Sequence, residues 1–151
     1  MSLAVLAALV AVGVGLIVAA IHFTGGSRSA SVASADAARE RFAIDYPRER
    51  STTVEITADR RSAFLALAGG RVGLVHAVGA KFLTRLLGPG DVDAVEIRDD
   101  RTLVVCFTDF TFPRARCTFE SADAAAVVAR GLGGLTSGRR AARWNSIPFR
   151  T

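Results

Sequence analysis

The chain has 151 residues, half of them hydrophobic and 22% charged, a composition typical of folded domains that excludes a chain disordered throughout. Once the apolar N-terminus is set aside, about 125 residues remain, which is enough for one small domain with tails. The formal net charge is +5, yet residues 54–135 carry ten basic and ten acidic side chains, and residues 136–151 carry four arginines and no acid. We therefore expect no nucleic-acid partner for the folded part, because a nucleic-acid reader needs a basic patch of its own.

Arginine supplies every basic side chain except Lys81, and alanine and glycine are abundant. This composition is typical of GC-rich coding and indicates a bacterial source. The cysteine and histidine side chains, which bind metals most readily, have a spacing that fits no known metal motif. They are Cys106, Cys117, His22 and His76. We expect no metal and no other cofactor.

Residues 1–23 are predicted to form a transmembrane anchor. Leu3 to Ile21 contains no charged or amide side chain, and at 1.5 Å per residue this run spans roughly 28 Å, close to the ~30 Å hydrocarbon core of a bilayer. The alternative is a cleaved signal peptide, which requires a basic segment before a shorter apolar run. Only two residues, neither of them basic, precede this run, and the small-residue site at residues 33–35 lies far beyond it. The anchor is therefore favoured.

The charges that flank the anchor predict its orientation. No lysine or arginine precedes it, whereas Arg28, Arg39 and Arg41 follow within about twenty residues. Under the positive-inside rule the C-terminal domain lies in the cytoplasm. We therefore expect a single-pass protein of the bacterial inner membrane whose cysteines stay reduced, whereas a periplasmic domain would make a disulfide an option.

Small residues recur at every fourth position of the anchor, namely Ala7, Ala11, Gly15 and Ala19. Such spacing lets helix backbones approach closely in lipid. The stripe predicts a helix–helix contact, either with a subunit of a membrane complex or with a second copy of the chain. Chance in an alanine-rich segment is the alternative explanation.

Residues 24–53 are predicted to form a linker, with glycine, serine and alanine dominating its first part. A short juxtamembrane helix is expected within it over residues 36–46, capped by Ser34 and ended by Pro47. This helix would place three side chains on one face, which are Ala38, Phe42 and Tyr46.

Residues 54–135 are predicted to form one small β-rich domain. Its segments alternate in hydrophobicity with a period of two, and glycine, proline and aspartate turns separate them. The strands expected from this pattern are residues 53–58, 71–79, 81–87, 92–97, 103–112 and 114–120. Residues 63–68 are uniformly apolar, so a buried strand and a turn of helix both remain open there, before a hairpin turn at Gly69 and Gly70.

After the last strand the period changes to that of a helix. Ser121 is a suitable N-cap, and glycines at 131, 133 and 134 end the pattern. The apolar face of this amphipathic helix consists of Ala124, Val127, Val128, Leu132 and Leu135. The predicted fold class is therefore α+β, with an antiparallel sheet of six or seven strands, curled or barrel-like, which the C-terminal helix closes.

The end of this domain reads RTLVVCFTDF, RARCTFE and SADAAAVVARGL, which is two strands and a helix. In this order of elements, residues 54–135 resemble the pleckstrin-homology-like (PH-like) fold, a bent antiparallel barrel capped by a C-terminal helix. The resemblance implies a binding module for phosphoinositides, peptides or other proteins. Lipid-binding members use basic residues in an early loop between strands, and the corresponding place here, residues 69–71, holds a single arginine.

Covalent catalysis needs a nucleophile beside a base, and His76 is the only histidine of the domain. A structural strand histidine is favoured over a dyad of His76 with Cys106 or Cys117. If residues 103–119 form a hairpin, both cysteines face the same apolar side, where we expect buried thiols. We therefore predict no catalytic residue.

The last segment, residues 136–151, interleaves arginine with aromatic side chains. Such a tail suits an anionic membrane surface or the acidic groove of a partner, and a solvated terminus is the alternative. The residues expected to make this contact are Arg139, Arg140, Arg143, Trp144, Phe149 and Arg150.

Two functions fit these features. The first is a non-catalytic adaptor in which a membrane-tethered PH-like domain binds a protein partner. The second is an accessory or assembly subunit of a larger membrane complex, held there by the small-residue stripe. An enzyme is disfavoured because neither a nucleophile–base pair nor a metal cluster is evident.

Overall fold

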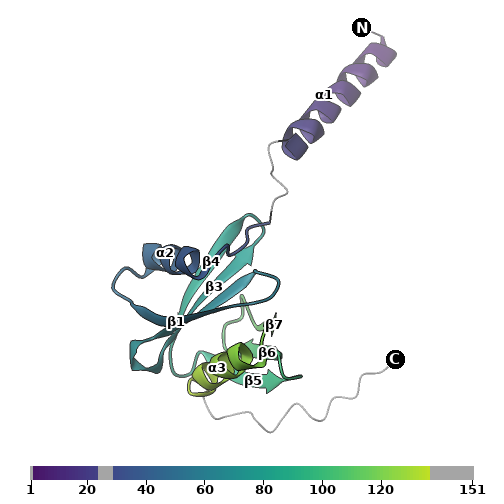
Figure 1. Ribbon diagram of the computed structural model, residues 1–151. Helices are drawn as coiled ribbons and strands as arrows, with labels where there is room; N and C mark the ends of the chain where they lie inside the picture. Colours follow the sequence, from purple (N-terminus) through teal and green to yellow (C-terminus); the bar gives the residue numbers. More distant parts are fainter. Residues whose placement is uncertain (1, 24–28, 137–151) are drawn as a thin grey trace, which may run out of the picture.

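A computed structural model describes residues 2–23 and 29–136. The fold is α+β, with an N-terminal apolar helix, two small antiparallel sheets that together hold seven strands, and a C-terminal helix. Figure 1 shows these elements in order, with a further helix, α2, lying against the first sheet.

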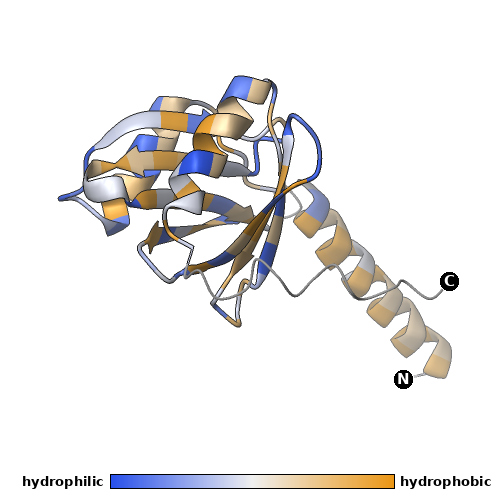
Figure 2. Ribbon diagram, turned by 90° about the horizontal axis from the view of Figure 1, so that it is seen from below, coloured by the Kyte–Doolittle hydropathy of each residue, from blue (hydrophilic) through white to orange (hydrophobic). Residues whose placement is uncertain are grey.

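Helix α1 (Leu3–Phe23) is long and apolar enough to cross a membrane. None of this span is buried against the rest of the described chain. Figure 2 shows it hydrophobic over most of its length, whereas the strands and helices of the domain mix hydrophobic and hydrophilic residues. A signal sequence near an N-terminus satisfies the same criteria of length and composition.

Helix α2 (Ala35–Asp45) lies within one residue of its predicted bounds. The Ser34 hydroxyl accepts a hydrogen bond from the Ala37 amide at 3.1 Å, as expected of an N-cap. Pro47 has no amide hydrogen to continue the helix. The buried side chains of α2 are Ala38 and Phe42, both on the predicted face.

Seven strands form the two sheets, in the orders β1-β2-β3-β4 and β5-β6-β7. The first sheet contains β1 (Ser51–Ile56), β2 (Ser62–Leu67), β3 (Val72–Val78) and β4 (Lys81–Leu87), with a single 3-10 turn (Ala68–Gly70) between β2 and β3. The second sheet contains β5 (Val92–Ile97), β6 (Thr102–Phe107) and β7 (Arg114–Thr118), and helix α3 (Ala122–Gly133) follows. The segment that the sequence left open, residues 63–68, is therefore mainly a strand.

The two sheets meet at one corner and separate at the other, so they do not close into a barrel. At the first corner Thr57 forms an isolated bridge with Phe119. At the second, the ladders of the described strands leave β4 unpaired with β5. Residues 88–91 direct the chain from one sheet to the other there, because Gly90 adopts a φ of +92° and Pro89 has no amide to extend a ladder.

The main core lies between the two sheets and under α3. Phe64 and Leu74 from the first sheet meet Leu103 and Val105 from the second, and Leu132 of α3 covers them. These side chains are buried because alternate residues of each strand face the same side. Figure 1 shows α3, the predicted C-terminal helix, beside β5 and β6.

A second core lies on the outer face of the first sheet, under α2. Phe42 packs there with Leu65 and Val75. Gly73 makes the room for it, because a Cβ at this position would lie 2.8 Å from two ring carbons of Phe42, closer than packed carbon atoms approach. Strands β2 and β3 are thus buried on both faces, which explains why residues 63–68 show no alternation.

The β6–β7 hairpin differs from its prediction. Strand β6 ends at Phe107, whereas the predicted strand continued to residue 112. The Asp109 carboxylate accepts a hydrogen bond from the Thr111 amide at 2.7 Å, a local turn contact that competes with strand pairing. Phe110, which lies within the predicted strand, is 95% exposed.

The loop also changes the register that was expected for the two cysteines. Leu103 pairs with Cys117, and Cys106 pairs with Arg114. Cys117 is buried in the main core, whereas Cys106 is half-buried on the opposite face of the sheet, so the prediction of a shared face is wrong. The hairpin is centred nearer residue 110 than expected, and a shift by an odd number of residues reverses the face.

Truncation of Phe42 is expected to destabilise the domain. Phe42→Ala should lower the free energy of unfolding by about 3–5 kcal/mol, because it removes a buried ring and leaves a cavity under α2. Ile44→Ala, on the same helix but 70% exposed, is the control and should change it by less than about 0.5 kcal/mol. Urea unfolding followed by circular dichroism measures both, and equal effects would show that α2 does not pack as described.

The two thiols are expected to differ in reactivity. Burial raises the pKa of Cys117 to about 12, and the nearby Asp59 charge acts in the same direction. Maleimide should therefore label Cys106 in the native protein and Cys117 only after unfolding. Mass spectrometry of labelled peptides measures this, with Cys117→Ala as the control, and native labelling of Cys117 at the rate of Cys106 would contradict it.

Candidate functional site

A cleft of about 530 Å³ runs along β4 at the open corner of the two sheets. Five consecutive residues of β4, Leu83 to Leu87, form one wall. Tyr46 at the end of α2, Asp91 at the start of β5 and residues 107–109 at the end of β6 complete the lining. The cleft therefore exists because β4 has a free edge, with other elements arranged around it.

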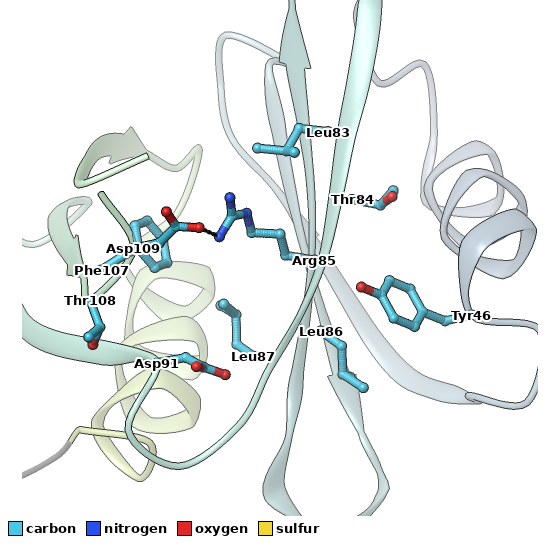
Figure 3. A pocket seen from close by; sticks show the side chains of 10 residues that line it. All are labelled: Tyr46, Leu83, Thr84, Arg85, Leu86, Leu87, Asp91, Phe107, Thr108 and Asp109. Carbon is cyan, nitrogen blue, oxygen red and sulfur yellow. Dashed lines mark hydrogen bonds and ion pairs between the residues drawn. The ribbon is translucent and has the colours of Figure 1, made fainter. Parts of the chain in front are cut away.

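Side chains of β4 alternate between two sides of this edge. Figure 3 shows Arg85 and Leu87 directed toward residues 107–109, and Thr84 and Leu86 directed toward Tyr46. The alternation is the ordinary period of a strand. A segment lying along the edge of β4 would therefore find a separate set of side chains on each side.

The side of the cleft next to β6 is held by an ion pair. Arg85 donates through Nη1 to the carboxylate of Asp109 and through Nη2 to the Thr111 hydroxyl at 2.9 Å (Figure 3 shows the first contact). The Nε atom of Arg85 is buried and has no hydrogen-bond partner among the described residues. A buried donor left unused is costly, so this guanidinium has capacity for one more acceptor.

Asp109 is strongly held in its ionised form. Its pKa is lowered to about 2, first by the hydrogen bond from the Thr111 amide, next by the Thr111 hydroxyl, and then by Arg85. The carboxylate therefore stays charged across the physiological range and keeps Arg85 in place.

The side next to α2 is also ordered. The Tyr46 ring stacks on Phe42, with ring centroids 4.8 Å apart. The Thr84 hydroxyl donates to the carboxylate of Asp45, which also pairs with Arg41 at 3.4 Å. The cleft thus combines an unpaired strand edge, hydroxyl and carboxylate groups, the two aromatic rings of Tyr46 and Phe107, and aliphatic walls, which suits the binding of an extended chain.

A serine–histidine pair lies outside the cleft, and the sequence analysis missed it. The Ser62 hydroxyl and the Nδ1 atom of His76 are 2.7 Å apart, and these residues are cross-strand partners in β2 and β3. The expected hairpin turn at residues 69–70 was a usable signal, since a turn centred on Gly69 sets Ser62 opposite His76. Ser62 is only 4% exposed, and the His76 ring packs on Phe112, so the pair is part of the packed structure.

The linker is fastened to the other end of the first sheet. The Ala30 amide donates to the Gly79 carbonyl at 2.6 Å, and the Val32 amide donates to the Arg60 carbonyl at 2.8 Å. The turns after β1 and after β3 therefore lie at the end of the domain where the described chain resumes at Ser29. Leu83, the first cleft residue of β4, lies two positions after Lys81, where β4 begins at this end.

This end also holds the loop between β1 and β2, the first loop between strands. The loop contains Arg60 and Arg61, whereas residues 69–71 form the second. Arg60 donates to the Ala33 carbonyl at 3.1 Å, and Arg61 donates to the Ala77 carbonyl at 3.4 Å. Both guanidinium groups thus already bind the chain itself.

The predicted site residues have different positions. The stripe of Ala7, Ala11, Gly15 and Ala19 lies on α1, and a Cβ added at Gly15 would have nothing within 4 Å. Its contact with another helix stays a prediction. The tail residues Arg139, Arg140, Arg143, Trp144, Phe149 and Arg150 lie outside the described residues. Of the parts that the structure describes, none groups three metal-binding side chains.

The environment of His76 predicts a pH dependence of stability. Burial lowers the pKa of His76, the positive charge of Arg61 lowers it further, and Asp59 opposes them. Because the unfolded chain takes up this proton first as the pH falls, the free energy of unfolding should decrease below the ordinary value of 6.5 and be insensitive to this group above it. Urea unfolding between about pH 5 and 8 measures this, and His76→Asn should remove the slope that His76 contributes. Identical slopes in the two proteins would contradict the assignment.

No known protein family, no curated protein and no solved structure matches the chain. Its function must therefore be inferred from the fold and the cleft themselves.

Proposed function

We propose that the chain is a non-catalytic, single-pass membrane protein whose PH-like domain binds an extended segment of a protein partner along β4. The observation that carries this proposal is the cleft at the free edge of β4, lined by residues 83–87. An extended peptide adds to such an edge through main-chain hydrogen bonds, and pockets for alternate side chains provide the specificity.

The linker supports presentation of this cleft at the membrane surface. Five residues lie between Phe23 and Ser29, so an extended chain spans at most about 20 Å from one to the other. Ala30 and Val32 are bonded to the turns at one end of the first sheet, which must therefore lie near the anchor. The cleft runs along β4 from Leu83 away from that end, where a partner can reach it.

The order of elements supports the PH-like part of the proposal. Four strands, three strands and a final helix follow one another, as the resemblance implies, although the corner between β4 and β5 stays open. The arginines at 28, 39 and 41 favour a cytoplasmic domain on a bacterial inner membrane. In that reducing compartment both cysteines remain thiols, and the structure holds them as free cysteines.

The second candidate function is that of an accessory subunit in a larger membrane complex. The observation that favours it is the uncovered surface of α1, which carries the small-residue stripe. In lipid such a stripe is a packing surface for another transmembrane helix. The two functions differ in which part of the chain holds the partner.

Substitution in the cleft is expected to release the partner. Thr84→Arg places a bulky cation in the wall of the cleft and should reduce the amount of partner retained by about tenfold, equivalent to ~1.4 kcal/mol. Thr53→Arg makes the same change at an exposed position of β1 outside the cleft and should have no effect. The tagged full-length chain is purified in mild detergent, and quantitative mass spectrometry measures what it retains.

The same experiment separates the two functions. If both arginine variants keep their partners while Ala11→Leu with Gly15→Leu loses them, the accessory-subunit function is correct and the cleft is not the binding site.

A further inference from the structure

The described chain leaves the domain beside the cleft. The Leu135 carbonyl accepts a hydrogen bond from the Gly90 amide at 2.9 Å, and Thr136 forms a parallel bridge with Val92. The Gly90 carbonyl in turn accepts a hydrogen bond from the hydroxyl of Thr108, a cleft residue, at 2.7 Å. Thr136, the last described residue, therefore lies beside Val92, which directly follows the cleft residue Asp91.

The charges of the cleft and of the remaining chain are complementary. The lining contains two carboxylates, of Asp91 and Asp109, and a single guanidinium, which Asp109 already pairs. Asp91 is exposed, and its carboxylate accepts only the hydrogen bond that the structure records from the Gly88 amide at 2.8 Å. Residues 137–151 carry four arginines and no acid. The unbalanced charge of the cleft is therefore opposite to that of the tail.

The other side chains also match. The tail places Trp144 and Phe149 among its arginines, and the cleft offers the Tyr46 ring together with leucines at 83, 86 and 87. Arginine stacks favourably on an aromatic face, and aromatic side chains fill aliphatic clefts. A chain that carries both residue types can place them on the two sides of a strand edge.

The length of the tail allows this contact within one molecule. Fifteen residues follow Thr136, and when extended they reach about 50 Å. The five cleft residues of β4 cover only about 15 Å of strand. A segment joined by so short a connection has an effective concentration in the millimolar range, so a weak interaction is sufficient to hold it.

We propose that residues 137–151 occupy the cleft along β4 in the same molecule and thereby compete with the protein partner. This inference rests on the proposed function, since it assigns an internal ligand to the same cleft. A partner segment must then displace the tail before it binds, which restricts the cleft to partners of higher affinity.

The single tryptophan of the chain provides the test. Trp144 fluorescence is measured on the full-length chain in nanodiscs of phosphatidylcholine, together with its quenching by acrylamide. Docking predicts blue-shifted, shielded emission, and Thr84→Arg should shift it to the red and raise the quenching constant. Thr53→Arg is the matched control and should leave both unchanged. In about 1 M salt, where the Debye length is ~3 Å, the native chain should resemble the cleft variant.

Two results would overturn the inference. One is a Trp144 as exposed in the native chain as in Thr84→Arg. The other is shielding that survives the cleft variant and increases with phosphatidylserine, which would place the tail on the membrane. Asp91→Asn is a second test in case Thr84→Arg does not fold. It keeps an acceptor for the Gly88 amide and removes the negative charge, so it should expose Trp144 in a folded chain.

The partner assay separates this inference from the proposed function. A chain ending at Thr136 should retain more partner than the full chain if the tail competes. Unchanged retention with an exposed Trp144 would remove the tail from the cleft and leave the proposed function standing. A Trp144 that is shielded in the native chain and exposed by Thr84→Arg, with retention of the partner unchanged by Thr84→Arg, would leave the tail in the cleft and contradict the proposed function.

Discussion

The burial of the first sheet on both faces is the constraint on which the rest of this structure depends. Its inner face packs on the second sheet and α3, and its outer face packs on α2 through Phe42, which lies directly over Gly73. Because α2 is the next element after α1, this contact fastens the start of the domain to the first sheet. The same sheet contributes β4, which forms one wall of the cleft. A side chain at residue 73 would push α2 away from the first sheet and disturb this contact.

A sheet with two buried faces still has edges, and their treatment decides where other chains can bind. A free strand edge invites pairing with another chain, so proteins usually cover or interrupt it. At one corner the Thr57–Phe119 bridge ties the edge of β1 to the other sheet. At the other corner β4 has no strand beside it in the described structure, and Arg85 spans from it to Asp109 instead. That ion pair fixes the width of the opening without pairing the backbone. An edge kept open in this way can accept another extended chain, and the proposed partner segment and the tail are both assigned to it.

Features set by a few neighbouring residues were predictable from the sequence, and features set by long-range pairing were not. Ser34 and Ser121 cap their helices as expected, because a cap depends on the next turn alone. The alternation around Cys117 also held, since that strand buries one face only. The shared face of the cysteines failed because Asp109 and Thr111 build a turn that moves the register of the hairpin. The cleft was not foreseen, since it joins residues from α2, β4 and β6 whose proximity depends on the angle between two sheets.

The Ser62–His76 pair and the cleft lie in different parts of the domain. Ser62 and His76 lie at hydrogen-bond distance, as a nucleophile and its base would. The Ser62 hydroxyl is buried in the first sheet, and the partial burial of His76, together with the Arg61 charge, lowers the pKa of His76. The cleft is accessible, and its lining provides hydrogen-bond donors, acceptors and a strand edge but contains neither histidine nor cysteine. The proposed binding of an extended chain relies on these groups and on the free edge of β4, because main-chain hydrogen bonds to such an edge need no activated side chain.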